Sequence, residues 1–286
     1  MAKAPVWLIT GASRGLGLEI ARAALKAGHF VVAGYRDKAK IQSAFTEIEA
    51  LGGTWVQLDV AGGDVESQVQ SVIAQHGQID VLVNNAGYAI LGSIEETSVE
   101  QIETIFRTNF VGPLRTIKAV LPSMRSRHSG TIVNISSSNA FSIAPGLGIY
   151  VATKFALEGV TEVLQTEISS FGIRTLLVEP GMTATDMLDP AGTGIKLPLT
   201  DAYRDTAVQR TEEALLIGTG ERPPWSADPA HVAQRIVEAV DGTGILAGKP
   251  VGLRLPLGKD TGSALETRAA GYTALLGDMK EVWESV

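Results

Sequence analysis

The clearest candidates for chemistry in this sequence are a tyrosine and a lysine four residues apart, Tyr150 and Lys154. Residues at this spacing share one face of a helix, so a phenol and an ammonium group would lie close together. Reduction of a ketone needs a proton donor for the nascent alkoxide, and a nearby ammonium group stabilises a phenolate. We therefore expect Tyr150 to donate the proton, with Lys154 lowering the pKa of the phenol from its free value of about 10.

A serine thirteen residues before the tyrosine, Ser137, extends this pattern. It follows an apolar, β-rich run at 131–136, from which its hydroxyl could hydrogen-bond the substrate oxygen and hold it against Tyr150. An isolated Tyr-x-x-x-Lys has a simpler interpretation, in which the ring packs in the core and the lysine extends to solvent. The pattern becomes specific only together with the elements that precede it.

A glycine-rich turn near the N-terminus predicts a site for a dinucleotide phosphate. The first apolar run leads into the turn Thr-Gly-Ala-Ser-Arg-Gly-Leu-Gly at 10–17, and a helical segment follows. Glycines let the backbone approach a pyrophosphate, and the helix N-terminus offers free N–H groups to the anion. The spacing differs from G-x-G-x-x-G, and the alternative is a tight connection without a ligand. Its position directly after the first strand favours the ligand site.

The choice of cofactor depends on the end of the second predicted strand, where an NAD site needs a carboxylate for the ribose 2′-hydroxyl. Tyr35 and Arg36 stand there instead. The Arg36 guanidinium could bind a 2′-phosphate, and Arg14 could supply a second positive charge to the same group. We therefore expect NADP(H) to be preferred, with NAD(H) possible because Asp37 is the next residue. Either arginine could instead be an ordinary surface charge.

The elements that must position these residues alternate between strand and helix. Apolar β-rich runs occur at 6–10, 30–35, 54–58, 80–84, 131–136 and 173–179, and helical patterns at 16–27 and 64–76 lie between them. Such alternation predicts βαβ crossovers and a parallel sheet. Since the runs are apolar throughout, helices should cover both faces. We therefore expect an α/β protein with a Rossmann-like doubly wound sheet, forming one domain over residues 1–286.

Two later segments depart from this alternation. Residues 187–228 are interrupted by prolines and glycines and predict a partly helical insertion, which we interpret as a lid over the substrate. A variable surface excursion is the alternative. A short strand near 251–255 and a helix over about 261–283 end the chain, and this helix makes up most of a C-terminal extension at 259–286.

Composition excludes several classes of function. A net charge of −7 argues against a nucleic-acid-binding surface, and the absence of cysteine excludes disulfides and thiolate chemistry. The four histidines lack the spacing of metal ligands, so no metal site is predicted. No apolar run approaches the roughly 18 residues of a membrane span, so no membrane association is expected. We expect a cytoplasmic enzyme that acts on a small molecule.

The order of these motifs resembles the short-chain dehydrogenase/reductase family, over nearly the whole chain up to about residue 185. The matching motifs are Thr-Gly-x-x-x-Gly-x-Gly at 10–17, Asp-Val at 59–60, Asn-Asn-Ala-Gly at 84–87, Asn109, the Ser137, Tyr150 and Lys154 pattern, and Pro-Gly-x-x-x-Thr at 180–185. The resemblance implies that Asn109 holds a water for proton relay, that 59–60 contact adenine and that 180–185 hold the nicotinamide carboxamide. It favours Ser137 over Ser136 and Ser138, because only Ser137 has the required spacing.

The motifs and the resemblance together predict one complete set of site residues. The catalytic residues expected are Asn109, Ser137, Tyr150 and Lys154. The cofactor contacts expected are Gly11, Ser13, Arg14, Gly15, Leu16, Gly17, Tyr35, Arg36, Asp59, Val60, Asn85, Ala86, Gly87, Tyr150, Lys154, Pro180, Gly181, Thr183 and Thr185. The resemblance also implies about seven strands in the order 3-2-1-4-5-6-7 and a homodimer or homotetramer.

The activity implied is NADPH-dependent reduction of a ketone or aldehyde to an alcohol, or the reverse oxidation. The subgroup most similar contains 17-beta-hydroxysteroid and retinol dehydrogenases, which implies an apolar or secondary-metabolite-like carbonyl substrate. An NAD-dependent alcohol dehydrogenase or a redox epimerase of the same fold remains open. A dinucleotide-binding regulator without turnover is disfavoured, because it would have no chemical need for all four catalytic residues.

Overall fold

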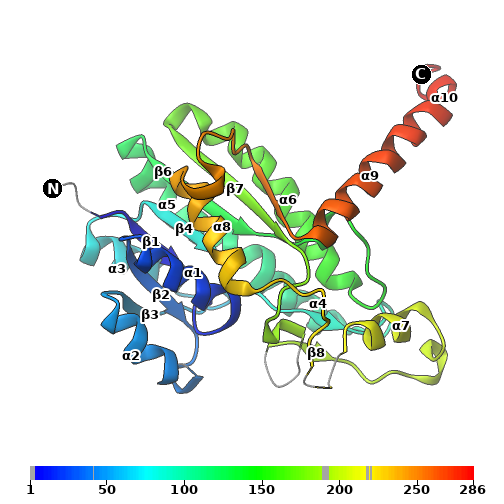
Figure 1. Ribbon diagram of the computed structural model, residues 1–286, viewed down its shortest axis with the longest axis horizontal. Helices are drawn as coiled ribbons and strands as arrows, with labels where there is room; N and C mark the ends of the chain where they lie inside the picture. The colour runs from blue at the N-terminus through cyan, green and yellow to red at the C-terminus, as the bar shows by residue number, and fades with distance from the viewer. Residues whose placement is uncertain (1–3, 41, 189–192, 217–218, 220) are drawn as a thin grey trace.

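Seven parallel strands form the central sheet, in the order β3-β2-β1-β4-β6-β7-β9 (Figure 1). The computed structural model describes residues 4–40, 42–188, 193–216, 219 and 221–286. The strands are β1 (Val6–Ile9), β2 (Phe30–Tyr35), β3 (Thr54–Gln57), β4 (Val81–Asn84), β6 (Gly130–Ile135), β7 (Ile173–Pro180) and β9 (Arg254–Leu257). Numbered within this sheet alone, the order is 3-2-1-4-5-6-7, which confirms the predicted doubly wound fold.

Helices cover both faces of the sheet, as the uniformly apolar strands require. One face carries α1 (Gly15–Lys26), α2 (Gln42–Ala50) and α8 (Pro229–Asp241), and the other carries α3 (Val65–His76), α5 (Gly112–Arg127) and α6 (Gly148–Ile168). Helix α8 was not predicted. The sequence features that mark its start are local. The Asp228 carboxylate accepts a hydrogen bond of 2.8 Å from the Ala230 N–H, and Pro229 is the first residue of the helix.

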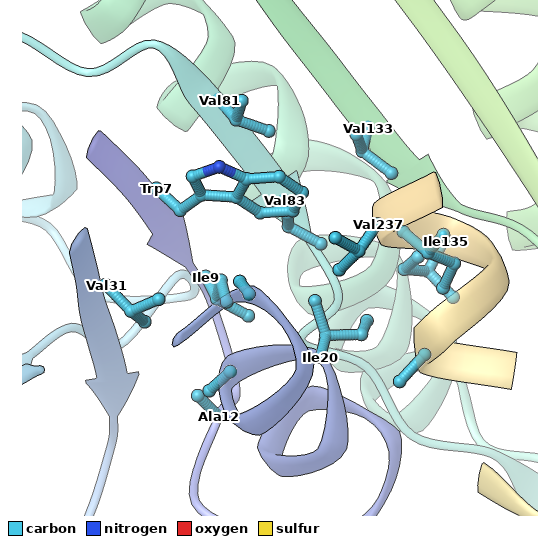
Figure 2. Packing of buried hydrophobic residues seen from close by; sticks show 14 of the residues in the cluster. Trp7, Ile9, Ala12, Ile20, Val31, Val81, Val83, Val133, Ile135 and Val237 are labelled. Carbon is cyan, nitrogen blue, oxygen red and sulfur yellow. The ribbon is translucent and has the colours of Figure 1, made fainter. Parts of the chain in front are cut away.

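The two apolar cores use alternate residues of the same strands. Trp7 and Ile9 of β1 pack with Ile20 of α1 and Val237 of α8 (Figure 2), whereas Leu8 belongs to the opposite core. All three β1 side chains are fully buried. Burial of a large apolar side chain contributes about 1.5–3 kcal/mol, so these layers hold the strands rigidly beneath the site.

The chain reverses direction across the sheet between β1 and β4. Strands β2 and β3 lie on one side of β1, and β4, β6, β7 and β9 lie on the other. A crevice forms at the carboxyl ends of the strands at such a switch point, and ligands of doubly wound sheets bind there. The predicted glycine turn follows β1 and the predicted catalytic serine follows β6. Both therefore lie at this edge.

Shorter elements connect the strands and helices of the sheet. Strand β5 (Ile90–Leu91) pairs in parallel with β8 (Ile195–Lys196), and α4 (Val99–Phe106) runs into the π-helical turn η2 (Arg107–Val111). Helix α7 (Ala207–Ala214) lies within the predicted insertion at 187–228. The 3-10 turns are η1 (Lys38–Lys40), η3 (Ser138–Ala140), η4 (Ser169–Phe171), η5 (Asp186–Leu188), η6 (Asp201–Tyr203) and η7 (Gly244–Leu246). Residues 189–192, 217–218 and 220 of the insertion lie outside the described residues.

The C-terminal extension projects away from the body of the protein (Figure 1). Helix α9 (Lys259–Asp278) follows β9 directly, and α10 (Lys280–Trp283) continues in the same direction. The predicted strand near 251–255 lies two to three residues later than expected, because it pairs with β7 from Arg254 onward. As the edge strand of the sheet, β9 accommodates Pro256 without loss of an inner ladder bond.

Candidate active site

The predicted phosphate turn is built by close backbone packing between the ends of β1 and β4. Gly11 has a positive φ of +63°, a conformation that favours glycine. A Cβ on Gly17 would lie 2.3 Å from the Asn85 amide nitrogen, so only glycine fits there. That amide donates hydrogen bonds of 3.1 Å to the carbonyl oxygens of Thr10 and Gly11. The turn is therefore held in shape by Asn85.

Thr10, the first residue of the glycine motif, has an anchoring role that the sequence analysis did not assign to it. Its buried hydroxyl oxygen accepts hydrogen bonds of 3.0 Å from the backbone N–H groups of Asn85 and Ala86. The side chain of Asn85 and the backbone of Ala86 are thus occupied in joining two loops. Their predicted role in contacting the cofactor stays untested, whereas their part in shaping the turn is visible.

Two arginines lie on the side of the turn predicted to bind the adenosine end. Within the described residues, neither Arg14 nor Arg36 forms an ion pair with a carboxylate. Arg36 is exposed, half-buried Arg14 occupies the N-cap position of α1, and no side-chain cap closes that helix. The Asp37 carboxylate instead accepts a hydrogen bond of 3.0 Å from the Ala39 N–H. Among the described residues, the two guanidinium groups therefore have no carboxylate partner, while the Asp37 carboxylate is hydrogen-bonded within its own turn.

Tyr150, Lys154 and Ser137 meet in a buried cluster at the end of β6. Tyr150 is 5% exposed, and the Lys154 ammonium nitrogen lies 5.6 Å from the centroid of its ring. The Lys154 ammonium group also donates a hydrogen bond of 2.8 Å to the Ile135 carbonyl, the last residue of β6. The Ser137 hydroxyl hydrogen-bonds the phenol of Tyr150. The structure therefore brings these three predicted residues together.

The pKa of Tyr150 differs from the sequence-based expectation. Burial raises the pKa of the phenol to about 12, and the hydrogen bond from Ser137 opposes this rise without reversing it. Removal from water penalises the phenolate more than its neighbours stabilise it. The phenol of Tyr150 is therefore protonated at neutral pH and available as a proton donor.

Burial acts on Lys154 in the opposite direction. It lowers the pKa of the ammonium group to about 8, while the negative charge of Glu158 one helical turn later opposes the shift. A buried ammonium group with this pKa gains and loses its proton within the physiological range. Lys154 is thus the group of the pair whose charge responds to pH.

Apolar residues from several segments enclose Tyr150. They comprise Ala89, Ile90, Leu91, Ile105 and Leu147, with Met187, Leu188, Leu197 and Leu215 packed against them. The last four belong to the predicted insertion or its start, so these described residues of the insertion pack on the tyrosine side of the site. The enclosure accounts for the burial that raises the pKa of Tyr150.

Asn109 lies in the π-helical turn between α4 and α5 and faces the same region. Its amide nitrogen donates to the Tyr88 carbonyl at 2.8 Å and to the Thr153 hydroxyl at 3.2 Å, and its amide oxygen accepts from the Tyr88 N–H at 3.1 Å. Thr153 lies on α6 between Tyr150 and Lys154. The Asn109 side chain therefore ties the loop after β4 to the catalytic helix, and its predicted role with a relay water stays a prediction.

A cluster of charged residues that sequence reasoning missed lies directly behind Lys154. Arg254 of β9 pairs with three carboxylates, those of Glu158 at 2.6 Å and of Glu162 and Glu179. Glu158 also accepts a hydrogen bond of 2.7 Å from the Ser136 hydroxyl. Burial and the nearby Glu158 raise the pKa of Glu179 to about 7. The (i, i+4) spacing of Lys154, Glu158 and Glu162 was the available signal.

The loop after β7 crosses toward the glycine turn. A Cβ on Gly15 would touch Thr185 at 3.5 Å, and the Thr183 hydroxyl donates to the Gly181 carbonyl at 3.1 Å. The Asp260 carboxylate, at the start of α9, accepts a hydrogen bond of 2.7 Å from the Met182 N–H. The predicted nicotinamide loop is thus fixed by the C-terminal extension, a contact that no motif indicated.

The remaining predicted residues take different positions around this edge. Val60 is 4% exposed, and its side chain packs in the core beneath Gly112, while Asp59 accepts a bond of 3.1 Å from the Ala61 N–H. Tyr35 packs edge-on against Trp55, with ring centroids 6.1 Å apart. Residues with partial exposure are Ser13, Leu16 and Gly87, whereas Pro180 is buried at the end of β7.

Comparison with known proteins identifies the family. A family model described as short chain dehydrogenase matches residues 5–195. The chain belongs to the short-chain dehydrogenase family. An oxidoreductase of Botryotinia fuckeliana, BOA17, is 34% identical over 270 residues, covering 93% of this chain and 94% of its own. Retinol dehydrogenase 8 of Bos taurus is 37% identical, covering 83% of this chain and 79% of its own. The resemblance expected from the motifs is confirmed.

Solved short-chain dehydrogenases share the fold over the full length. One from Streptomyces avermitilis superimposes with a TM-score of 0.87 at 34% identity, covering 100% of this chain and 99% of that chain. One from Sphingobium yanoikuyae, solved in complex with NADPH, has a TM-score of 0.70 at 24% identity and covers 99% of this chain and 96% of that chain. The latter likeness concerns the fold alone.

Membrane-spanning helices and metal-binding clusters are both absent from the described residues. Among them, no helix combines the length and apolar character needed to cross a lipid bilayer. The same residues contain no group of three or more histidine or acidic side chains arranged to hold a metal ion.

Proposed function

We propose that this protein is an NADP(H)-dependent oxidoreductase that interconverts an apolar ketone or aldehyde and its alcohol. The observation that carries the proposal is the buried contact of Tyr150 with Ser137 and Lys154 at the carboxyl edge of the sheet. The phenol is a proton donor there, the hydroxyl holds a carbonyl oxygen, and the ammonium group stabilises negative charge as the proton leaves.

The residues at the glycine turn fit a dinucleotide. The N-terminus of α1 has no side-chain cap, and Gly17 leaves no room for a Cβ beside the turn. A bound nicotinamide dinucleotide would supply the hydride of the reaction. Gly11 to Gly17 would hold its pyrophosphate, and residues 180–185 would lie toward the nicotinamide. NADP-bound neighbours of this fold, including the Sphingobium yanoikuyae enzyme with NADPH, support this proposal.

A preference for the phosphorylated cofactor follows from the charges near the end of β2. Arg14 and Arg36 have no carboxylate partner in the described part of the chain, so each guanidinium is available to a 2′-phosphate. The Asp37 carboxylate is held by the Ala39 N–H and would need to leave that bond to reach a ribose hydroxyl. Charge-assisted hydrogen bonds to phosphate are about twice as strong as neutral ones.

The proton path proposed within the protein uses its own side chains. Ser137 holds the substrate oxygen while Tyr150 passes its phenolic proton to the developing alkoxide. The Lys154 ammonium group stabilises the phenolate that remains, and Asn109 fixes the backbone of the loop beside them. For oxidation the same steps run in reverse.

The proposed substrate is apolar because apolar side chains are exposed on segments that flank Ser137 and Tyr150 and on the proposed lid. Ile94, which contacts the start of α6 at Gly148, is 66% exposed, and Ile143 in the loop after Ser137 is 76% exposed. Trp225 of the proposed lid is 57% exposed. Exposed apolar side chains near a reactive cluster are typical of a binding site for an apolar ligand. The name of the relative retinol dehydrogenase 8 agrees with this class.

The test is the oxidation of NADPH, followed by absorbance, with a panel of apolar ketones, aldehydes and quinones. The wild-type protein should reduce at least one of them, and Tyr150→Phe should lose about 10²- to 10⁴-fold in kcat while still binding NADPH by fluorescence. Tyr272→Phe, far out on α9, is the matched control and should retain full turnover. Undiminished turnover by Tyr150→Phe would contradict the proposed proton donor.

A further inference from the structure

The projecting C-terminal extension carries an apolar stripe with a regular spacing. Its members are Leu265, Ala269, Tyr272, Leu276, Met279, Trp283 and Val286. Successive members are separated alternately by four and three residues. A 4-3 alternation corresponds to a period of 3.5 residues, which is the repeat of a helix that packs along another helix in a coiled coil.

This stripe is exposed along its whole length. Leu265 is 38% exposed, Tyr272 53%, Leu276 62% and Trp283 50%. Among the described residues, only the first half of α9 contacts the rest of the protein. There the buried Thr261 hydroxyl donates to the Leu257 carbonyl, and the Arg268 guanidinium lies over the rings of Phe155 and Tyr272. From Ala269 onward every residue is exposed, and Figure 1 shows this part directed away from the body.

The helix is poorly suited to stand alone in water. Gly262, Gly271 and Gly277 lie within α9, and a Cβ on any of them would meet no atom within 4 Å. Each glycine costs a helix about 1 kcal/mol relative to alanine. Isolated helices are marginally stable even with favourable sequences, and most helical stability comes from packing of an apolar face. A partner along the stripe would supply this packing.

We propose that the extension pairs with the same extension of a second copy, as an antiparallel two-helix coiled coil. This goes beyond the proposed reaction, since it assigns a partner and a surface. An antiparallel register centred near Ala274 pairs large residues with smaller ones. Leu265 would face the partner's Trp283, Ala269 the partner's Met279, and Tyr272 the partner's Leu276, so the layers have similar widths.

Charges and flanking residues favour the same register. Glu266 would lie beside the partner's Lys280, and Leu275, which is 55% exposed, would approach its own copy at the twofold axis. In a parallel pair each stripe residue would face itself, so Trp283 would oppose tryptophan and Ala269 would oppose alanine. Glu266 would then have no cation opposite. An isologous antiparallel contact uses the self-complementarity of the stripe.

The extension's charge argues against an anionic membrane surface as the alternative occupant. Residues 259–286 contain three cationic side chains, Lys259, Arg268 and Lys280, and five acidic ones. Helices that lie on anionic membranes are rich in lysine and arginine along their polar face. A net negative helix with a coiled-coil repeat is therefore better suited to pairing with a second helix than to lying on an anionic membrane.

The first test measures the molar mass of the full-length protein by light scattering with size exclusion. Wild-type protein should be an even-numbered oligomer, and Leu276→Asp should halve its mass. Ala274→Asp introduces the same charge on the opposite face and should leave the mass unchanged. Because both positions are exposed on α9, NADPH oxidation should persist in both variants. A wild-type monomer, or an unchanged mass for Leu276→Asp, would overturn the proposal.

The second test determines the direction of the pair and uses the absence of cysteine in the sequence. The single variants Tyr272→Cys and Leu276→Cys are prepared separately, mixed and oxidised. Antiparallel pairing should give disulfide dimers of the mixture and few from either variant alone, since a disulfide needs Cα atoms within about 7 Å. Cross-linking of each variant with itself would show parallel pairing and contradict the register. Absence of all cross-links would contradict the contact.

Discussion

The Lys154 ammonium nitrogen lies 5.6 Å from the centroid of the Tyr150 ring, and burial shifts the pKa values of the two groups in opposite directions. The phenol is held protonated by a pKa raised to about 12, whereas the ammonium group has a pKa lowered to about 8. In the reduction direction, the proton that is needed is therefore present throughout the neutral range. The charge on Lys154 that stabilises its departure is instead lost as the pH rises through about 8.

This relationship predicts the pH dependence of reduction. Lys154 carries its positive charge below a pKa of about 8 and loses it as the pH rises through that value. Since the cation stabilises the phenolate, kcat/KM for ketone reduction should be level near pH 6–7 and fall above pH 8 by about tenfold per unit. The measurement is kcat/KM with saturating NADPH across pH 6–10.

Lys154→Arg supplies the control for this prediction. The guanidinium remains charged at every pH in that range. Reduction should be slower because the geometry changes, but the decline above pH 8 should vanish. A decline that persists unchanged in Lys154→Arg would assign the titration to another group.

A second prediction concerns the choice of cofactor. Replacement of Arg36 by leucine should raise the KM for NADPH by about 10- to 100-fold, the loss of one charge-assisted contact to a phosphate, and should leave the KM for NADH nearly unchanged. Lys38→Leu removes the same charge two residues away, where the ammonium group lies over the Phe45 ring at 5.7 Å, and serves as the control. If both variants raised the KM for NADPH equally, the increase would come from the loss of positive charge in this region and not from a contact that only Arg36 makes.

The success of the sequence in predicting the fold has a local cause. Strands such as β1 are apolar on both faces, so burial between two helical layers was their only stable environment. The pairing of Tyr150 with Lys154 was equally predictable, since their spacing on one helix determines that they share a face. Ser137 follows the end of β6, and ligands of parallel sheets bind at the carboxyl ends of the strands.

The residues that sequence reasoning missed or misjudged depend on distant parts of the chain. Arg254 meets Glu158 across 96 residues, and the pairing exists only because β9 joins β7. The pKa of Tyr150 was misjudged because the motif indicates the nearby ammonium group and not the apolar cover to which Met187, Leu188, Leu197 and Leu215 contribute. The Asn85 amide also fixes the backbone of the glycine turn, a role that depends on β4 lying beside β1, while its predicted cofactor contact stays a prediction.

A third prediction follows from the charged cluster behind Lys154. The pKa of Glu179 is raised to about 7, chiefly by burial and then by the charge of Glu158. The folded protein therefore holds this proton more tightly than the unfolded chain, and the free energy of unfolding should fall as the pH rises from about 4.5 to about 7. Glu179→Gln should flatten this fall, measured by urea unfolding at several pH values.

Glu162→Gln is the matched control for this measurement. Its carboxylate contacts the same Arg254 but its side chain is 53% exposed. The pH dependence of unfolding should therefore remain close to that of the wild type. Identical curves for Glu179→Gln and the wild type would show that Glu179 titrates normally.

A fourth prediction links the C-terminal extension to the cofactor. The Asp260 carboxylate accepts the Met182 N–H at 2.7 Å and lies against Gly181, so the first turn of α9 fixes the loop proposed to bind nicotinamide. Asp260→Ala should free this loop and weaken NADPH binding by about 3- to 10-fold, the value of one hydrogen bond. Tyr150 does not contact Asp260, so the pH at which reduction declines should stay the same.

Fluorescence titration with NADPH gives the dissociation constant for this variant, and the pH profile gives the second readout. Asp278→Ala removes a carboxylate from the far end of the same helix and should bind NADPH as the wild type does. Asp260→Asn retains an oxygen acceptor and should recover most of the affinity, because the loss is one of backbone positioning and not of charge. If Asp260→Asn binds as weakly as Asp260→Ala, the carboxylate acts through its charge, and the positioning role of α9 is wrong.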